Sequence, residues 1–177
     1  TAFGFVPCAV QRNGVRGNRD EGSIHAMKIG IAGTGRMGPA IAARLAGLGN
    51  EIMVWNRSAD KARALGFKVA ATPSQLVDSS EFIISILTDA KAVDAVYAEM
   101  LKGSVKDKLF IEMSTVRPDV QQRISSRVKE KQGRFIECPV GGTIGPAKEG
   151  KLFGFAGGEA ADVARAKPLL DQMCRRV

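Results

Sequence analysis

The chain has 177 residues, of which 45% are hydrophobic and 25% charged, a balance typical of a soluble globular domain and not of a disordered chain. A single histidine, His25, excludes a multi-histidine metal site, and no apolar run is long enough to cross a bilayer. The three cysteines, Cys8, Cys138 and Cys174, are odd in number and far apart, which argues against a disulfide framework and for a reducing compartment.

The formal net charge is +8, from 26 basic and 18 acidic side chains, and it favours phosphate-bearing or polyanionic ligands. Nucleic acid is one such ligand. However, the chain has one Trp and one Tyr, and its densest basic stretch, 123–134, has the pattern of a solvated helix face. Because no recognition motif accompanies the charge, we expect no nucleic-acid partner.

Residues 1–26 differ in character from the rest, because a mildly apolar stretch is followed by one rich in Gly, Asn and Arg. This order is the reverse of a secretory signal, and the acidic residues Asp20 and Glu21 argue against a transit peptide. Met27 is followed at once by a strand pattern. We therefore expect 1–26 to be a non-native or disordered leader and 27–177 to form one domain.

From Met27 onward, short apolar runs alternate with segments of helical period, the pattern of parallel strands joined by crossover helices. This pattern predicts an α/β fold with a doubly wound, mostly parallel sheet. The predicted strands are 28–32, 51–55, 82–87, 109–112, 134–138 and 152–156, with a weaker one at 68–70, and Arg176 and Val177 resemble the opening of another. The predicted helices are 37–48, 59–65, 73–77, 90–100, 118–131 and 160–173.

A glycine-rich motif stands between the first predicted strand and the first predicted helix. In a G-x-G-x-x-G pattern the first glycine permits a tight turn, the second lets a pyrophosphate approach the backbone, and the third allows helix and strand to pack closely. The helix amides then face the phosphates. The sequence therefore predicts a Rossmann-type dinucleotide site, against the alternative of an ordinary Gly-rich turn, at Gly33, Thr34, Gly35, Arg36, Met37 and Gly38.

The end of the second predicted strand indicates which dinucleotide is bound. An NAD site has an acidic residue here for the ribose 2′-hydroxyl, whereas a 2′-phosphate needs a cation instead. The residues present are Asn56, Arg57 and Ser58, one neutral, one cationic and one with a hydroxyl. We expect NADP(H) to be preferred over NAD(H). Asn56 and Ser58 are also good caps for the following helix, a role compatible with binding.

Four ordered segments give the chain a family resemblance. They are KIGIAGTGRMG at 28–38, ILTDA at 86–90, EMST at 112–115 and ECPVGGTIGPAKEGKLFGFAGG at 137–158. Together they resemble the cofactor domain of the β-hydroxyacid dehydrogenases, the group that includes 3-hydroxyisobutyrate dehydrogenase and tartronate semialdehyde reductase. The resemblance implies hydride transfer between a nicotinamide cofactor and a small β-hydroxyacid in a cytoplasmic homo-oligomer. Imine reductases, 6-phosphogluconate dehydrogenase and non-catalytic NADP-binding modules stay as alternatives.

The resemblance also implies roles for particular residues. It puts Leu87 and Thr88 along the cofactor and Thr115 near the nicotinamide, although both threonines could instead cap helices. It assigns the substrate to the loop of Gly141, Gly142 and Thr143, with a simple turn after Pro139 as the alternative.

The sequence lacks three features of the family. Gly141 stands where the family has the serine that holds the substrate carboxylate. The catalytic lysine of the family lies beyond Val177, as does its all-helical second domain. We therefore expect a cofactor-binding fragment that carries no catalytic residue of its own and no metal site.

Overall fold

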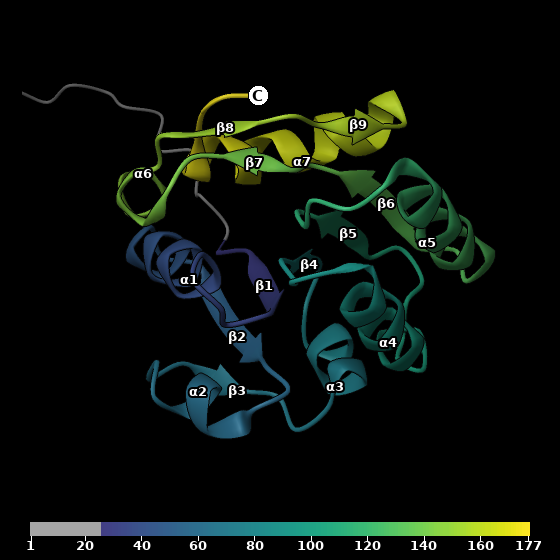
Figure 1. The fold of residues 1–177 in the computed structure, drawn as a ribbon, viewed down its shortest axis with the longest axis horizontal. Coiled ribbons are helices and arrows are strands. Elements are labelled where there is room, and N and C mark those ends of the chain that lie inside the picture. Colours follow the sequence, from purple (N-terminus) through teal and green to yellow (C-terminus); the bar gives the residue numbers. More distant parts are fainter. Residues whose placement is uncertain (1–25) are drawn as a thin grey trace, which may run out of the picture.

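The computed structural model describes residues 26–177. The predictions for the leader, Cys8 and His25 therefore lie outside the described residues, Ala26 excepted. Figure 1 shows a large twisted sheet with helices on both sides and a smaller sheet above it.

The large sheet has seven strands in the order β3-β2-β1-β4-β5-β6-β9. All neighbouring pairs run parallel except β6 and β9. Strand order reverses between β1 and β4, which is where ligands bind in open α/β sheets. The doubly wound, mostly parallel fold is confirmed with these strands: β1 (Lys28–Ala32), β2 (Glu51–Trp55), β3 (Lys68–Val69), β4 (Phe82–Ser85), β5 (Leu109–Glu112), β6 (Arg134–Glu137) and β9 (Gly157–Gly158).

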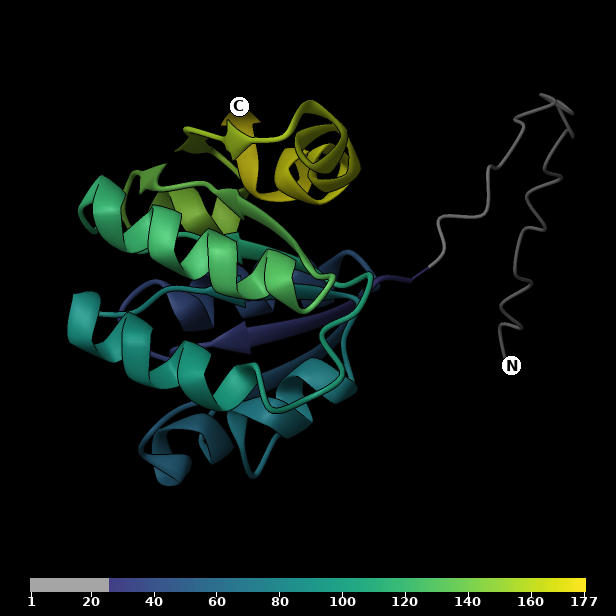
Figure 2. The same cartoon turned by 90° about the vertical axis from the view of Figure 1, so that its right-hand side faces the viewer.

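Helices cover both faces of this sheet, which explains why its strands are apolar on both sides. On one face lie α1 (Gly38–Gly47) and α7 (Ala160–Met173), packed on Ile31, Ile84 and Ile111, and α6 (Ile144–Glu149) packs against both of these helices. On the other face lie α3 (Pro73–Asp78), α4 (Ala90–Met100) and α5 (Pro118–Glu130), packed on Ile83 and Phe110. Figure 2 shows α4 and α5 side by side across the sheet. The short α2 (Ala59–Arg63) connects β2 to β3.

Most predicted elements are confirmed, and several end earlier than predicted. Helices α1, α3 and α5 carry Pro in their first turn, where the missing amide donor costs nothing. The strand predicted over 82–87 ends at Ser85, and the Leu87 amide binds the Ser114 side chain instead of a neighbouring strand. The helices predicted over 37–48 and 59–65 are also shorter, at 38–47 and 59–63.

The strand predicted over 152–156 forms, but the assumption that it joins the main sheet is wrong. It is β8 (Leu152–Gly154), and it lies between β10 (Cys174–Arg176) and β7 (Val140–Gly141) in a separate three-stranded sheet. The chain reverses between β7 and β8 through α6 (Ile144–Glu149), entered after Gly142 with a φ of +140° and left at Gly150 with a φ of +71°, so β8 returns antiparallel to β7. Helix α6 was not predicted. Gly145 and Pro146 weaken its pattern, although both lie in its first turn, where they are tolerated.

No helix within residues 26–177 combines the length and the apolar character needed to cross a membrane.

Candidate functional site

The glycine-rich loop lies at the carboxyl end of β1, and backbone crowding explains two of its three glycines. The Gly33 amide donates to the Trp55 carbonyl at 2.9 Å, and Gly33 has a φ of +103°. A Cβ at Gly33 would overlap the Ile86 carbonyl oxygen, and a Cβ at Gly38 would overlap the Gly33 carbonyl oxygen. The tight turn therefore requires glycine at both positions.

Gly35 differs from these glycines, because no atom lies within 4 Å of the position its Cβ would take. Protein packing therefore does not require this glycine, and its bare backbone faces open space at the start of α1. A ligand pyrophosphate would make the close approach that leaves no room for a side chain here.

Thr34 provides an independent test of whether this loop fits an anion. Its side chain is buried, and within residues 26–177 its Oγ1 has no hydrogen-bond partner. Unpaired buried hydroxyls are unusual in folded proteins. Helix α1 carries no acidic residue in its first turn, and the exposed Arg36 lies beside it. The loop thus fits the phosphates of a dinucleotide, which would accept hydrogen bonds from these groups.

At the end of β2, the predicted ribose-binding residues are accessible. Arg57 and Ser58 are exposed and Asn56 is half-buried. The alternative that Asn56 and Ser58 cap α2 is not seen, because Ser58 occupies the N-cap without a side-chain bond and the Asn56 Oδ1 accepts from the Thr34 amide at 3.1 Å. Within the described part of the chain, Arg57 forms no ion pair.

The loops after β4 and β5 lie at the same edge of the sheet as the glycine-rich loop. The Leu87 amide donates to the Ser114 Oγ at 2.7 Å, which joins the two loops directly. Thr88 and Thr115 are exposed and cap no helix, because the N-caps of α4 and α5 are Asp89 and Arg117. Their capping alternative is therefore wrong. The EMST motif contained Ser114, but our sequence reasoning singled out only Thr115.

Asp89 caps α4 by accepting from the Ala92 amide at 2.8 Å. This hydrogen bond is the main cause that lowers the pKa of the Asp89 carboxyl. The side chain is exposed and stays ionised at neutral pH, so a negative charge stands at the rim of the cofactor edge.

The predicted substrate loop lies in the smaller sheet and not among the cofactor loops. Gly141 ends β7, Gly142 has a φ of +140°, and Thr143 is the N-cap of α6 without a side-chain bond. Helix α6 packs against α1, the helix that the glycine-rich loop opens (Figure 1). The loop 141–143 therefore leads into the helix that packs against α1.

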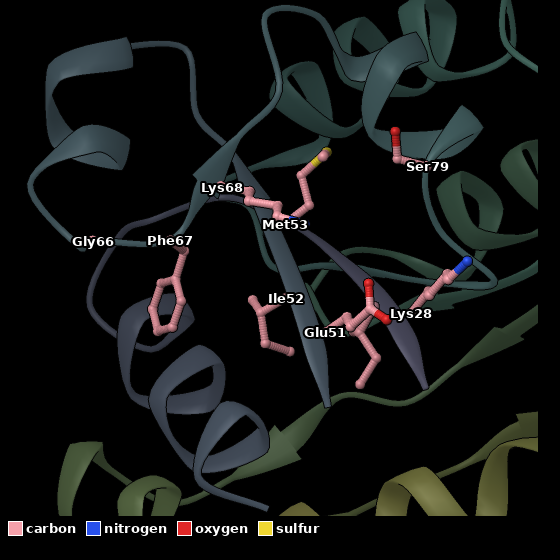
Figure 3. A pocket seen from close by; sticks show the side chains of 9 residues that line it. Lys28, Glu51, Ile52, Met53, Gly66, Phe67, Lys68 and Ser79 are labelled. Carbon is pink, nitrogen blue, oxygen red and sulfur yellow. The ribbon is translucent and has the colours of Figure 1, made fainter. Parts of the chain in front are cut away.

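A separate hollow lies at the other end of the strands. Figure 3 shows Ile52, Met53 and Phe67 along it, with Glu51 beside Lys28. Lys28 and Glu51 are the first residues of β1 and β2 and are paired in register. Because the glycine-rich loop follows the last residue of β1, this hollow is not part of the candidate cofactor site.

The fold and the glycine-rich loop define a Rossmann-type dinucleotide-binding domain. The chain belongs to the family described as the NAD binding domain of 6-phosphogluconate dehydrogenase, whose model matches residues 28–177.

Comparisons with known proteins agree with this family. The mitochondrial 3-hydroxyisobutyrate dehydrogenase of Drosophila melanogaster is 34% identical over 156 residues, which are 86% of this chain and 48% of that protein. The cytokine-like nuclear factor N-PAC of the same species is 34% identical over 138 residues, 74% of this chain and 23% of that protein. The chain thus spans about half the length of the dehydrogenase and less of the nuclear factor.

Among solved structures, the 3-hydroxyisobutyrate dehydrogenase of Mycobacterium tuberculosis with L-serine superposes with a TM-score of 0.80. It is 24% identical, and the match covers 86% of this chain and 54% of that one. At this identity the similarity supports the fold.

Proposed function

We propose that this chain is the NADP-binding part of an oxidoreductase that interconverts a small β-hydroxyacid and its semialdehyde or ketone. The similarity to 3-hydroxyisobutyrate dehydrogenase supports the reaction class. When bound, a nicotinamide cofactor supplies or accepts the hydride. The chain's own residues bind and orient that cofactor at the carboxyl edge of the sheet.

In this proposal Gly33 to Gly38 hold the pyrophosphate, with the unpaired Thr34 hydroxyl and the first amides of α1 as donors. Leu87 and Thr88 lie along the cofactor, and Thr115 approaches its nicotinamide end. The loop 141–143 offers backbone amides and the Thr143 hydroxyl to the substrate carboxylate. A simple turn at 141–143 is the competing interpretation.

The preference for NADP(H) rests on one observation, the exposed Arg57 at the end of β2, which has no ion-pair partner within residues 26–177 and follows Asn56 in place of an acidic residue. A guanidinium can donate two hydrogen bonds to a phosphate, whereas NAD offers it only a hydroxyl. The Ser58 hydroxyl is available beside it, since its side chain makes no cap bond.

The test is to replace Arg57 with Ala and to measure the dissociation constants of NADPH and NADH. We expect the affinity for NADPH to fall about tenfold or more and the affinity for NADH to change less than about threefold. The matched control is Arg63→Ala, which removes the same charge from α2 at an arginine already paired with Asp60 at 2.9 Å. Equal losses for both cofactors would refute the phosphate role of Arg57.

The resemblance and the cysteine pattern support a cytoplasmic homo-oligomer as the setting of this reaction. No nucleic-acid partner is part of the proposal. An imine reductase or a 6-phosphogluconate dehydrogenase would use the same cofactor domain with another substrate.

The similarity to the nuclear factor N-PAC favours a second candidate, a non-catalytic NADP-binding module. The two candidates are separated by assaying the product of the whole gene with NADP⁺ and a panel of β-hydroxyacids. Turnover supports the dehydrogenase, whereas cofactor binding without turnover of any substrate supports the module.

A further inference from the structure

One carboxyl group lies deep in the sheet, beneath the two loops proposed to contact the cofactor. Glu112, the last residue of β5, has 0% of its surface exposed. Within the described part of the chain it forms no ion pair. Burying a carboxyl without a cation is costly unless hydrogen bonds compensate.

Both oxygens of Glu112 are hydrogen-bonded. The Oε2 accepts from the Ser85 hydroxyl at 2.5 Å, and the Oε1 accepts from the Ser114 amide at 2.7 Å. Ser85 is the last residue of β4 and is the register partner of Glu112. The carboxyl therefore connects the end of β4 with the loop that follows β5.

Ser114 extends this connection to the other cofactor loop. Its Oγ accepts from the Leu87 amide at 2.7 Å, and its carbonyl accepts from the Gln121 side chain at 3.4 Å. One closed chain of contacts thus joins Ser85, Glu112, Ser114 and the Leu87 backbone, since Leu87 follows Ser85 by two residues. The spacing between the Leu87–Thr88 and Ser114–Thr115 segments depends on this chain of contacts.

We propose that Glu112 is a positioning residue for the cofactor, acting through Ser114 to hold the loops after β4 and β5 at their binding separation. This inference rests on the proposed NADP-binding function. Glu112 itself does not reach the ligand, because its side chain is fully buried beneath Ser114. Its effect on binding passes through its contacts with Ser114 and Ser85.

Three substitutions and one control test the proposal, each measured by the dissociation constant of NADPH. Ser114→Ala removes the acceptor for Leu87, and we expect about a fivefold weaker affinity. Glu112→Leu removes both carboxyl contacts, and we expect a loss of about tenfold. Glu112→Gln keeps an acceptor for Ser114 and should stay within about threefold of the wild type.

The control is Tyr97→Phe. The Tyr97 hydroxyl lies 2.9 Å from the Ser85 Oγ and also hydrogen-bonds the Glu112 carboxyl, but within the described residues it forms no hydrogen bond with the loops after β4 and β5. We expect this variant to bind NADPH within about twofold of the wild type. A loss as large as that of Glu112→Leu would overturn the proposal, because it would assign the effect to general core stability.

The double variant Glu112→Leu, Ser114→Ala provides the decisive comparison. If both residues act through one contact chain, the double variant should bind about tenfold more weakly than the wild type, as Glu112→Leu does alone. Independent effects would multiply to about fiftyfold, and that outcome would overturn the proposal.

Amide hydrogen exchange at Leu87 in the ligand-free chain separates this inference from the proposed function. Exchange should quicken in Ser114→Ala and Glu112→Leu and stay near the wild-type rate in Glu112→Gln. If the wild type binds neither NADPH nor NADH, the proposed function fails. If it binds and Leu87 exchange is unchanged in every variant, the positioning role fails.

Discussion

The Asn56 side chain joins the glycine-rich loop to the end of β2. Its Oδ1 accepts a hydrogen bond from the Thr34 amide at 3.1 Å, and its Nδ2 donates to the Ser58 carbonyl at 3.0 Å. One neutral amide therefore satisfies a donor in the proposed phosphate loop and an acceptor in the proposed ribose loop. In the proposed site, this residue would therefore couple cofactor affinity to cofactor choice.

Asn56→Asp is expected to shift the preference toward NAD(H). The carboxylate can still accept from Thr34, but it loses the bond to Ser58 and sets a negative charge where the 2′-phosphate would lie. NADPH affinity should fall about tenfold or more, while NADH affinity is maintained or improved. The measurement is the ratio of the two dissociation constants. Asn56→Ala, which removes both bonds without adding charge, serves as control and should weaken both cofactors alike.

Gly35→Ala and Gly38→Ala should separate binding from stability. A Cβ at Gly35 meets nothing in the free chain, so we expect its free energy of unfolding to change by less than about 0.5 kcal/mol. NADPH affinity should nevertheless fall about tenfold, because the methyl group occupies the space of the pyrophosphate. Unchanged affinity in a folded Gly35→Ala chain would count against a phosphate at this position.

Gly38→Ala is the counterpart of that variant. Its Cβ would overlap the Gly33 carbonyl oxygen, so the loop must move before any ligand arrives. We expect a loss of about 1–3 kcal/mol in unfolding free energy together with weakened binding. Thermal and denaturant unfolding of the free chain measure the first effect. Wild-type stability in this variant would contradict the crowding at Gly33.

Most of the sheet could be predicted from the sequence, because most of its strands are apolar on both faces and are followed by a helical period. The smaller sheet could not, since β7 has two residues and the chain reverses through the unpredicted α6, whose pattern Gly145 and Pro146 weaken. In the site, the glycine spacing predicted Gly33, Gly35 and Gly38. The bridging role of Asn56 was missed, because it depends on how closely β1 and β2 approach in space.

Stability should depend on pH through Glu112. Burial raises the pKa of this carboxyl above its ordinary value of 4.5, against hydrogen bonds from Ser114, Ser85 and Tyr97 that lower it. The folded chain therefore holds a proton that the unfolded chain releases at lower pH, and its stability falls as the pH rises from 4.5 through the folded-state pKa.

Glu112→Gln cannot titrate, so it should lack this decline. The difference in unfolding free energy, variant minus wild type, should grow as the pH rises from 4.5 through the folded-state pKa of Glu112. Burial raises the pKa of Tyr97, which hydrogen-bonds Glu112, well above its ordinary value, so this phenol stays protonated over the same range in both proteins. A difference that is constant with pH would show that Glu112 titrates alike in the folded and unfolded chains.

The thiols of Cys138 and Cys174 should be protected from alkylation in the folded chain. Burial is the main cause that raises the pKa of Cys138 from 9.0 to about 12 and that of Cys174 from 9.0 to about 11. The thiolate is the reactive form, so its population at Cys138 is about a thousandfold lower than in an unfolded chain.

In a Cys8→Ser background, iodoacetamide labelling followed by mass spectrometry should find both thiols unreactive until denaturant is added. Both sulfurs lie against Gly154, since a Cβ there would be 3.2 Å from one Sγ and 3.3 Å from the other. If the folded chain is labelled as fast as the denatured chain, this part of the core opens readily. The same result would predict that Gly154→Ala is tolerated.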